Sequence, residues 1–238
     1  METGTTLDII RLLVGAVILF YASYTDIKTR RASNYLWVIM GATGLILILV
    51  QQLTIGFGNN INYLIFVPIM IALIYVLFQL GLIFGGADAK ALMAIAILVP
   101  IQPIIYDFPI WNTLLPFSFV ILFNSLLLFL AIPISLFIFN IFKRDMKIPH
   151  SFLGYRMAIK EAKGKYVWPL ERIVDGKLKF ATIPKSYDAE DEYIELEKFG
   201  IKEIWVTPKV PFMIPLLAGY VFSFIIGDIL SFIMGMSL

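Results

Sequence analysis

Residues 32–87, ASNYLWVIMGATGLILILVQQLTIGFGNNINYLIFVPIMIALIYVLFQLGLIFGGA, run for 56 positions without an Asp, Glu, Lys or Arg. A helix that crosses a membrane needs about 20 mostly apolar residues. This stretch therefore predicts two such helices, at 34–54 and 61–84, joined by a Gly- and Asn-rich turn. The next residue is Asp88. An ionisable side chain that emerges from so much apolar sequence is costly, so it indicates a functional site.

The rest of the chain is also typical of a membrane protein. Of the 238 residues, 60% are hydrophobic, where soluble domains have about 45–50%, and the mean hydropathy is +0.87. Further apolar segments lie at 6–26, 88–106, 114–142 and 210–236. We therefore predict an α-helical membrane protein with six transmembrane helices.

A polar block at 143–209 separates the fifth and sixth predicted helices. It holds 14 of the 19 Lys and Arg residues and 11 acidic ones, which predicts a small α+β insert. Within it we expect a helix at 150–162, a β-hairpin of 166–174 and 177–183 around Asp175-Gly176, and a strand at 201–206. The predicted division is residues 1–142 for helices 1–5, 143–209 for the insert and 210–238 for helix 6.

The basic residues predict the orientation. The loop after helix 1 holds Lys28, Arg30 and Arg31, and the insert is rich in Lys and Arg. Because cytoplasmic loops carry the excess of positive charge, loops 1, 3 and 5 are expected in the cytoplasm and both termini outside. We expect Lys143, Arg144 and Lys147 to anchor the membrane edge.

Composition excludes several kinds of chemistry. The chain has no cysteine, a single histidine and a formal charge of +2. Disulfides, thiol nucleophiles and Cys-ligated metals are therefore excluded, and zinc sites with paired histidines as well. We expect no metal or other cofactor and no nucleic-acid partner. His150 is expected to have a structural role.

Two acids, Asp26 and Asp88, are predicted at the cytoplasmic ends of helices 1 and 4. If these helices are neighbours, the carboxyl groups can share one proton, so that one acts as a base toward water while the other polarises a carbonyl. Two alternatives stay open, in which Asp88 only caps helix 4 and Asp26 only pairs with Arg30.

The residues before Asp88 fit such a site. Gly85 and Gly86 permit backbone conformations that a Cβ would forbid, and we expect them to allow a substrate strand close to the chain beside Asp88. Lys90 points away from Asp88 on a regular helix, so we expect it to extend to the membrane interface.

Gly85-Gly86-Ala87-Asp88 at the start of a membrane helix resembles the Gly-x-Gly-Asp motif of the GxGD intramembrane aspartyl proteases, with Ala87 in place of the second Gly. Residues 24–34, YTDIKTRRASN, are similar to the first catalytic segment of the branch that contains prepilin and archaeal preflagellin peptidases. The resemblance implies that Asp26 and Asp88 are catalytic and that Gly85, Gly86 and Ala87 shape the substrate site. No Cys-x-x-Cys segment is present, so N-methylation is not implied.

The same resemblance implies removal of the short basic leader from preflagellin and pilin-like precursors at the cytoplasmic membrane face. The stretch at 188–197 is acidic, and could contact such a leader. The alternative function is a small proton- or ion-coupled transporter, with Asp26, Asp88 and Asp228 as titrating groups. Asp228 lies within predicted helix 6, near the outer face of the membrane, where we expect it to pair with Arg11.

Overall fold

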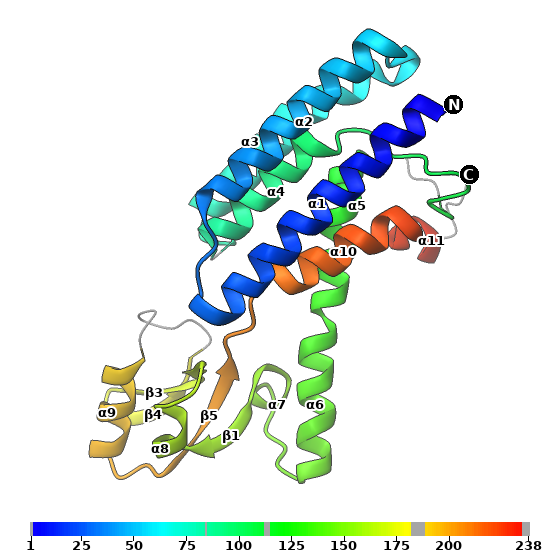
Figure 1. Cartoon of the computed structure of the whole chain (residues 1–238). Coiled ribbons are helices and arrows are strands. Elements are labelled where there is room, and N and C mark those ends of the chain that lie inside the picture. Colours follow the sequence, from blue (N-terminus) through cyan, green and yellow to red (C-terminus); the bar gives the residue numbers. More distant parts are fainter. Residues whose placement is uncertain (1, 84, 112–114, 182–188, 235–238) are drawn as a thin grey trace. The chain divides into compact units, whose positions relative to one another are not determined.

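The computed structural model describes residues 2–83, 85–111, 115–181 and 189–234. The chain forms two compact units (Figure 1), which we describe separately. The first unit comprises Met1–Phe129 and Pro211–Leu238, and the second comprises Leu130–Val210.

The first unit is helical. In chain order its elements are α1 (Glu2–Thr29), α2 (Asn34–Thr54), the 3₁₀ helix η1 (Gly58–Ile65), α3 (Phe66–Gln79), α4 (Gly86–Leu98), α5 (Phe117–Phe129), α10 (Met213–Ile225) and α11 (Ile229–Ile233). Within the described residues, four helical stretches are long and apolar enough to cross a membrane: Thr3–Thr29, Asn34–Thr54, Ile61–Gln79 and Phe117–Lys143. The protein is therefore mostly helical with four long apolar candidate spans, as expected for a multi-pass membrane protein.

Local signals explain where these helices begin and end. Ser33 caps α2, since its hydroxyl accepts a hydrogen bond from the backbone N–H of Tyr35 at 3.4 Å. Gly56, just after α2, has a φ of +68°, and Gly81, just after α3, has a φ of +70°. Glycine adopts this left-handed conformation without steric cost, so both helices stop where the sequence indicates a turn.

Close packing of small residues holds the helices together. A Cβ on Gly44 of α2 would lie 2.7 Å from the Cα of Leu98 and 2.8 Å from the backbone of Ile97, at the end of α4. A Cβ on Gly219 of α10 would lie 2.7 Å from the backbone of Ser125 in α5. Glycines at such points let helix backbones approach, which is a common way to pack membrane helices.

Two predicted helices differ from the structure. The segment predicted at 88–106 is helical only as α4, and the chain from Val99 to Pro116 is non-helical where described. The segment predicted at 210–236 is broken between α10 and α11, where Gly227 has a φ of +90°. Apolar composition alone extended both predictions, because it does not register the prolines after α4 or the backbone conformation at Gly227.

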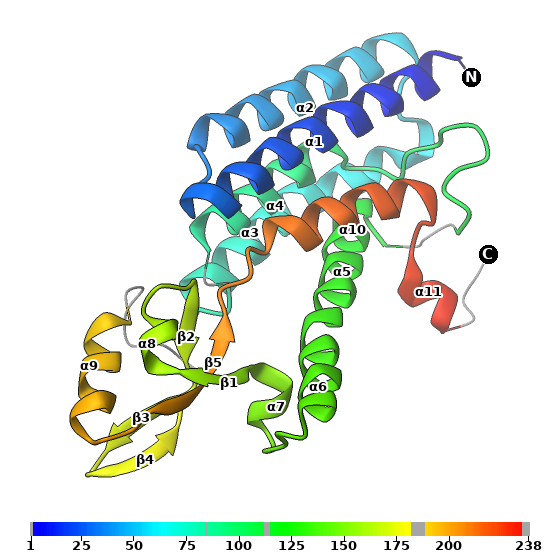
Figure 2. The same ribbon diagram turned by 60° about the horizontal axis from the view of Figure 1, so that its bottom comes forward.

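The second unit is a small mixed α/β structure that begins with α6 (Ala131–Lys143). Its short helices are α7 (His150–Leu153), α8 (Ile159–Ala162) and α9 (Glu190–Lys198), and its strands are β1 (Tyr155–Ala158), β2 (Val167–Pro169), β3 (Glu171–Val174), β4 (Lys177–Phe180) and β5 (Glu203–Pro208). Strand β5 lies between β1 and β2 and is antiparallel to both, as Figure 2 shows. Its core contains Ile159, Tyr193, Leu196 and Ile204.

The hairpin expected at 166–174 and 177–183 is confirmed at its turn and inner strands only. Residues 167–169 form β2, which pairs with β5 instead, and residues 182 and 183 lie outside the described residues. Strands β3 and β4 pair antiparallel, with Val174 opposite Lys177. The two residues between them, Asp175 and Gly176, have φ of +55° and +69°. Positive φ at both positions is the geometry of a type I′ turn, which Asp-Gly favours.

The helix expected at 150–162 is wrong. The chain there forms α7, then strand β1, then α8. Strand β1 pairs with β5, with Tyr155 opposite Val206, and these long-range hydrogen bonds override the local preference. The strand predicted at 201–206 is confirmed as β5, slightly displaced along the chain. Asp188 lies outside the described residues, and the acidic residues that follow it form α9.

Candidate active site

Asp26 lies in the last turns of α1, where it is half-buried. The helix ends soon after it, because Arg30 takes a left-handed φ of +56° while its N–H donates to the Asp26 carbonyl at 2.9 Å. The positive charge of Arg30 acts on the Asp26 carboxyl group. Lys28, also in the last turn, donates to the hydroxyl of Tyr24 on its own helix. The end of α1 is therefore rich in positive charge around one acid.

Asp88 is the third residue of α4, whose N-cap is Gly85. The interpretation of Asp88 as only the N-cap of this helix is therefore wrong. Its carboxyl group is half-buried, and the charge of Asp26 acts on it. Two acids 62 positions apart in the chain thus lie within range of a direct electrostatic interaction.

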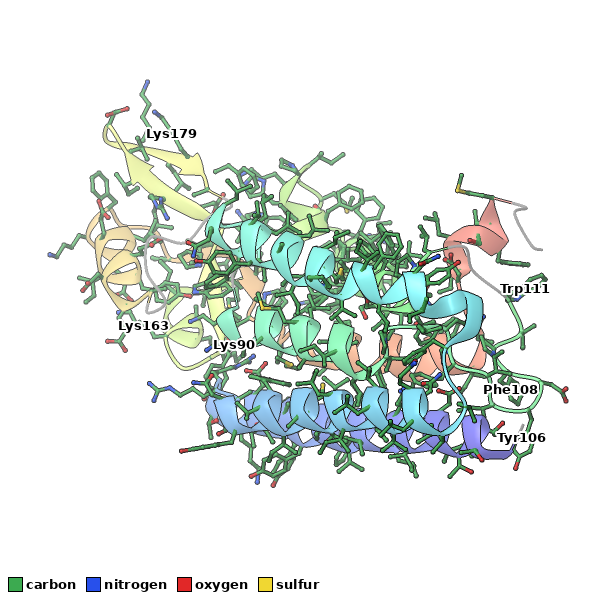
Figure 3. All side chains as sticks on the ribbon, turned by 90° about the horizontal axis from the view of Figure 1, so that it is seen from above. Lys90, Tyr106, Phe108, Trp111, Lys163 and Lys179 are labelled. Atoms are coloured by element: carbon green, nitrogen blue, oxygen red, sulfur yellow. The ribbon has the colours of Figure 1, made fainter. Side chains whose placement is uncertain are left out.

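The arrangement of the helices explains how the acids meet. Figures 1 and 2 show that the end of α1 and the starts of α2 and α4 lie at one end of the first unit. In Figure 3, Lys90 of α4 lies at this end, and Tyr106, Phe108 and Trp111 lie at the other. We name the first end, with Asp26, Asp88 and Lys90, the acid end of the unit.

Gly85 and Gly86 differ in what they allow. Gly85 has φ −96° and ψ 112°, and Gly86 is helical, so neither has a conformation that requires glycine. Neither residue therefore uses the backbone freedom that glycine permits. Gly85 matters sterically instead, because a Cβ there would lie 2.8 Å from the Cγ of Asp88 and closer still to Oδ2. A Cβ on Gly86 would meet only the ring of Phe78, at 3.7 Å.

Ala87 fills the second position of α4. It is half-buried and packs against the apolar core of the first unit. A small side chain therefore suffices at the position where the GxGD motif has its second glycine.

The sequence did not indicate a hydrogen bond that joins α4 to α2 at the acid end. The ammonium group of Lys90 donates a hydrogen bond to Oδ1 of Asn34, the first residue of α2, at 2.8 Å. The expectation that Lys90 only extends to the interface missed this bond. Asn34 does stand at the end of the segment that resembles the first catalytic motif, which was the available signal.

Asp228 and Arg11 do not pair with each other as expected. Arg11 is buried and donates to Asp8 at 2.7 Å, to Gln51 at 2.7 Å and to the carbonyl of Leu98 at 3.1 Å. Asp228 is the N-cap of α11, where its side chain accepts from the N–H of Leu230 at 3.0 Å. Both groups thus have local partners, because α10 ends before Asp228.

His150, the single histidine, is buried in the second unit. Its Nε2 lies 3.5 Å from Glu171, and its ring lies 4.4 Å from that of Phe180. Burial, and then the charge of Lys147, lower the pKa of His150, while the Glu171 carboxylate opposes them. These surroundings are those of a packed histidine, consistent with the structural role expected for it.

Comparisons with known proteins show the family of this chain. Residues 13–141 match the type IV leader peptidase family, and residues 146–229 match the family described as archaeal peptidase A24 C-terminus type II. The chain is 30% identical to a protein named preflagellin peptidase from Methanococcus voltae, over 94% of this chain and 98% of the relative. It is 29% identical to one of the same name from Methanocaldococcus jannaschii, over 92% and 94%. With a family match across more than half of its length, this chain belongs to the type IV leader peptidase family.

Proposed function

We propose that this protein is a membrane aspartyl endopeptidase that removes the short leader peptide from preflagellins and pilin-like precursors, with Asp26 and Asp88 as its catalytic pair. The observation that carries the proposal is that the end of α1, with Asp26, and the start of α4, with Asp88, lie at the same end of the first unit, where the charge of one acid acts on the other. Membership of the leader peptidase family and relatives named preflagellin peptidase supply the reaction class and the substrate.

The proposed chemistry needs the two half-buried carboxyl groups to come into close contact. Close carboxylates repel each other, so the pair holds one proton between them. The ionised member takes a proton from a water molecule, which attacks the carbonyl carbon of the scissile peptide bond. The protonated member donates to the carbonyl oxygen as charge develops there, and a proton then passes to the leaving amine. In this proposal, Gly85, Gly86 and Ala87 border the place of the substrate backbone.

We further propose six crossing segments: α1, α2, η1 with α3, α4 with the chain that follows it, α5 with α6, and α10 with α11. Helix α4 has 13 residues, about 20 Å of rise, which is short for a bilayer. Many of its own residues are buried, among them Ala91, Ile95 and Leu98. A broken segment is tolerated at membrane depth where protein surrounds it.

The proposed orientation places the acid end in the cytoplasm and both termini outside. Lys28, Arg30, Arg31 and Lys90 belong to the acid end or the loop beside it, which suits the positive-inside rule. The opposite end carries exposed Tyr106 and Phe108 with Trp111, and aromatic residues gather at membrane interfaces. Residues 143–209 are then a cytoplasmic insert, between the membrane segments of 1–142 and 210–238.

The transporter alternative has less support. It needs acids that titrate along a path through the membrane, and Asp228 was its third acid. The carboxylate of Asp228 instead accepts from Leu230 and from the hydroxyl of Ser231, at 2.6 Å, as a helix cap. A structural role accounts for its position.

The test incubates membranes that contain the protein with a preflagellin and follows the loss of its leader on gels. Asp26→Asn and Asp88→Asn are each expected to abolish cleavage, since each removes one member of the pair. Asp228→Asn is the matched control and is expected to stay active, because Asn caps helices as well as Asp does. Cleavage at the wild-type rate by either dyad variant would exclude this pair.

A further inference from the structure

The bond between Lys90 and Asn34 joins the two segments that carry the proposed catalytic acids. Asn34 is eight residues after Asp26, and Lys90 is two residues after Asp88. The hydrogen bond, at 2.8 Å, spans 56 positions of the chain. It therefore closes a short path from one acid to the other, through the corner between α1 and α2 and the first turns of α4.

At the acid end, the other contacts between the described residues of α2 and α4 are apolar and do not fix a direction. The tightest backbone approach, at Gly44, lies against Ile97 and Leu98, at the far end of α4. From Asn34 to Gly44 is about 15 Å of helix rise. Between them, Trp37 and Met40 are buried in the apolar core, and apolar packing has no preferred direction. The bond at Asn34 is directional, so it can fix the position of the corner more closely than apolar packing does.

Lys90 is poorly placed to act on the peptide bond itself. Residues two positions apart on a helix are separated by about 200° around its axis. Lys90 and Asp88 therefore point to different sides of α4. The ammonium group is also engaged by the amide oxygen of Asn34. The position of Lys90 therefore favours a role in holding α2 in place rather than a direct action on the substrate.

We propose that Lys90 is a positioning residue, which together with Asn34 clamps the start of α2 to the start of α4 and so holds Asp26 in reach of Asp88. The clamp deepens the proposed function and rests on it. A charged donor strengthens the bond relative to a neutral pair. When it is lost, the corner between α1 and α2 moves and the distance between the two carboxyl groups widens.

A cross-linking experiment measures that distance without relying on activity. The chain contains no cysteine, so the full-length Asp26→Cys/Asp88→Cys variant carries two thiols only. Its cross-linking, by a mild oxidant and by a short bismaleimide, is compared with and without Lys90→Met. The added change is expected to slow cross-linking about threefold or more, because disulfide formation needs closely matched positions.

Lys28→Met in the same background is the matched control. It removes an equal charge near Asp26 but breaks only a bond within α1. It is expected to leave the cross-linking rate unchanged. If Lys90→Met leaves cross-linking unchanged, or if both changes slow it equally, the clamp is refuted.

Cleavage of preflagellin provides the second readout. Lys90→Met and Asn34→Ala are each expected to lower kcat about tenfold with little change in KM, as for the loss of one charge-assisted hydrogen bond. The double variant is expected to be no worse than either single one. Asn34→Asp keeps an acceptor and Lys90→Arg keeps a donor, so both should retain most activity.

The two proposals fail in different ways. A wild-type protein that does not cleave preflagellin overturns the proposed function, and the cross-linking result still reports on the clamp. A wild-type protein that cleaves, with Lys90→Met and Asn34→Ala at the same kcat, overturns the clamp alone. Additive losses in the double variant would likewise show that the two residues act separately.

Discussion

Replacement of Gly85 by alanine tests how the site holds Asp88. The backbone at Gly85, with φ −96° and ψ 112°, suits any residue. The new Cβ, however, would stand 2.8 Å from the Cγ of Asp88. Ordinary contact needs about 3.4 Å or more between carbon atoms, so Cγ must move away by about 0.6 Å. The carboxyl oxygen Oδ2 lies closer still to the new Cβ and must move further. The backbone is expected to stay in place, because a side chain can rotate.

The expected cost is in catalysis and not in stability. A misplacement of about 1 Å in a catalytic group can lower the rate about 100-fold. Gly85→Ala is therefore expected to lower kcat for preflagellin by about that factor, while thermal unfolding in detergent changes little. Initial rates of leader removal over a range of substrate concentrations separate kcat from KM.

Gly86→Ala is the matched control one position further along. A Cβ there meets the Phe78 ring at an ordinary 3.7 Å, and alanine is the better helix former. Activity near that of wild type is expected, with stability unchanged or raised by up to about 1 kcal/mol. If Gly85→Ala cleaves like wild type, or if both variants lose activity equally, Gly85 does not position Asp88 in the way described.

Three further predictions concern packing and charge. Gly44→Ala places a Cβ 2.7 Å from the Cα of Leu98 and should lower stability in thermal unfolding by about 1–3 kcal/mol. Gly41→Ala, whose Cβ would lie 3.7 Å from the nearest atom, is the control and should not lower it. Equal stabilities of the two variants would contradict the close helix contact. Arg11→Met leaves the half-buried Asp8 without its ion pair and should cost up to about 3 kcal/mol in the same assay. The double variant Arg11→Met/Asp8→Leu should recover part of this loss, and no loss in the single variant would mean that the pair is not stabilising. The pKa of His150 is lowered in the folded chain, so near pH 6.5 and below the unfolded chain binds a proton that the folded chain does not. The contribution of the neutral, buried His150 to the free energy of unfolding is therefore full above about pH 6.5 and is lost as the pH falls below it. Fluorescence-monitored melts between pH 5 and 8 should show that loss in wild type and less of it in His150→Gln, and a gain in stability on acidification would refute it.

Much of the helical unit could be predicted from local pattern. The apolar segment at 34–54 appears as α2, and the one at 61–84 is helical from Ile61 to Gln79, because a long apolar run leaves few alternatives to a membrane helix. The turn at Asp175-Gly176 was predictable because few residue pairs accept positive φ at both positions. The helix expected at 150–162 is wrong because residues 155–158 pair as strand β1 with β5, a partner far along the chain that local pattern does not indicate.

For the candidate site, the sequence by itself determined the two acids, since Asp26 and Asp88 stand where charges are expensive and within recognisable motifs. Only the tertiary structure decided that the charge of one acid acts on the other, and that Asp88 stands inside α4 rather than at its cap. The steric role of Gly85 and the bond from Lys90 to Asn34 also belong to the tertiary structure. The physical reason is that hydrophobicity and turn preference are properties of neighbouring residues, whereas the partner of a side chain depends on how separate helices are rotated and packed.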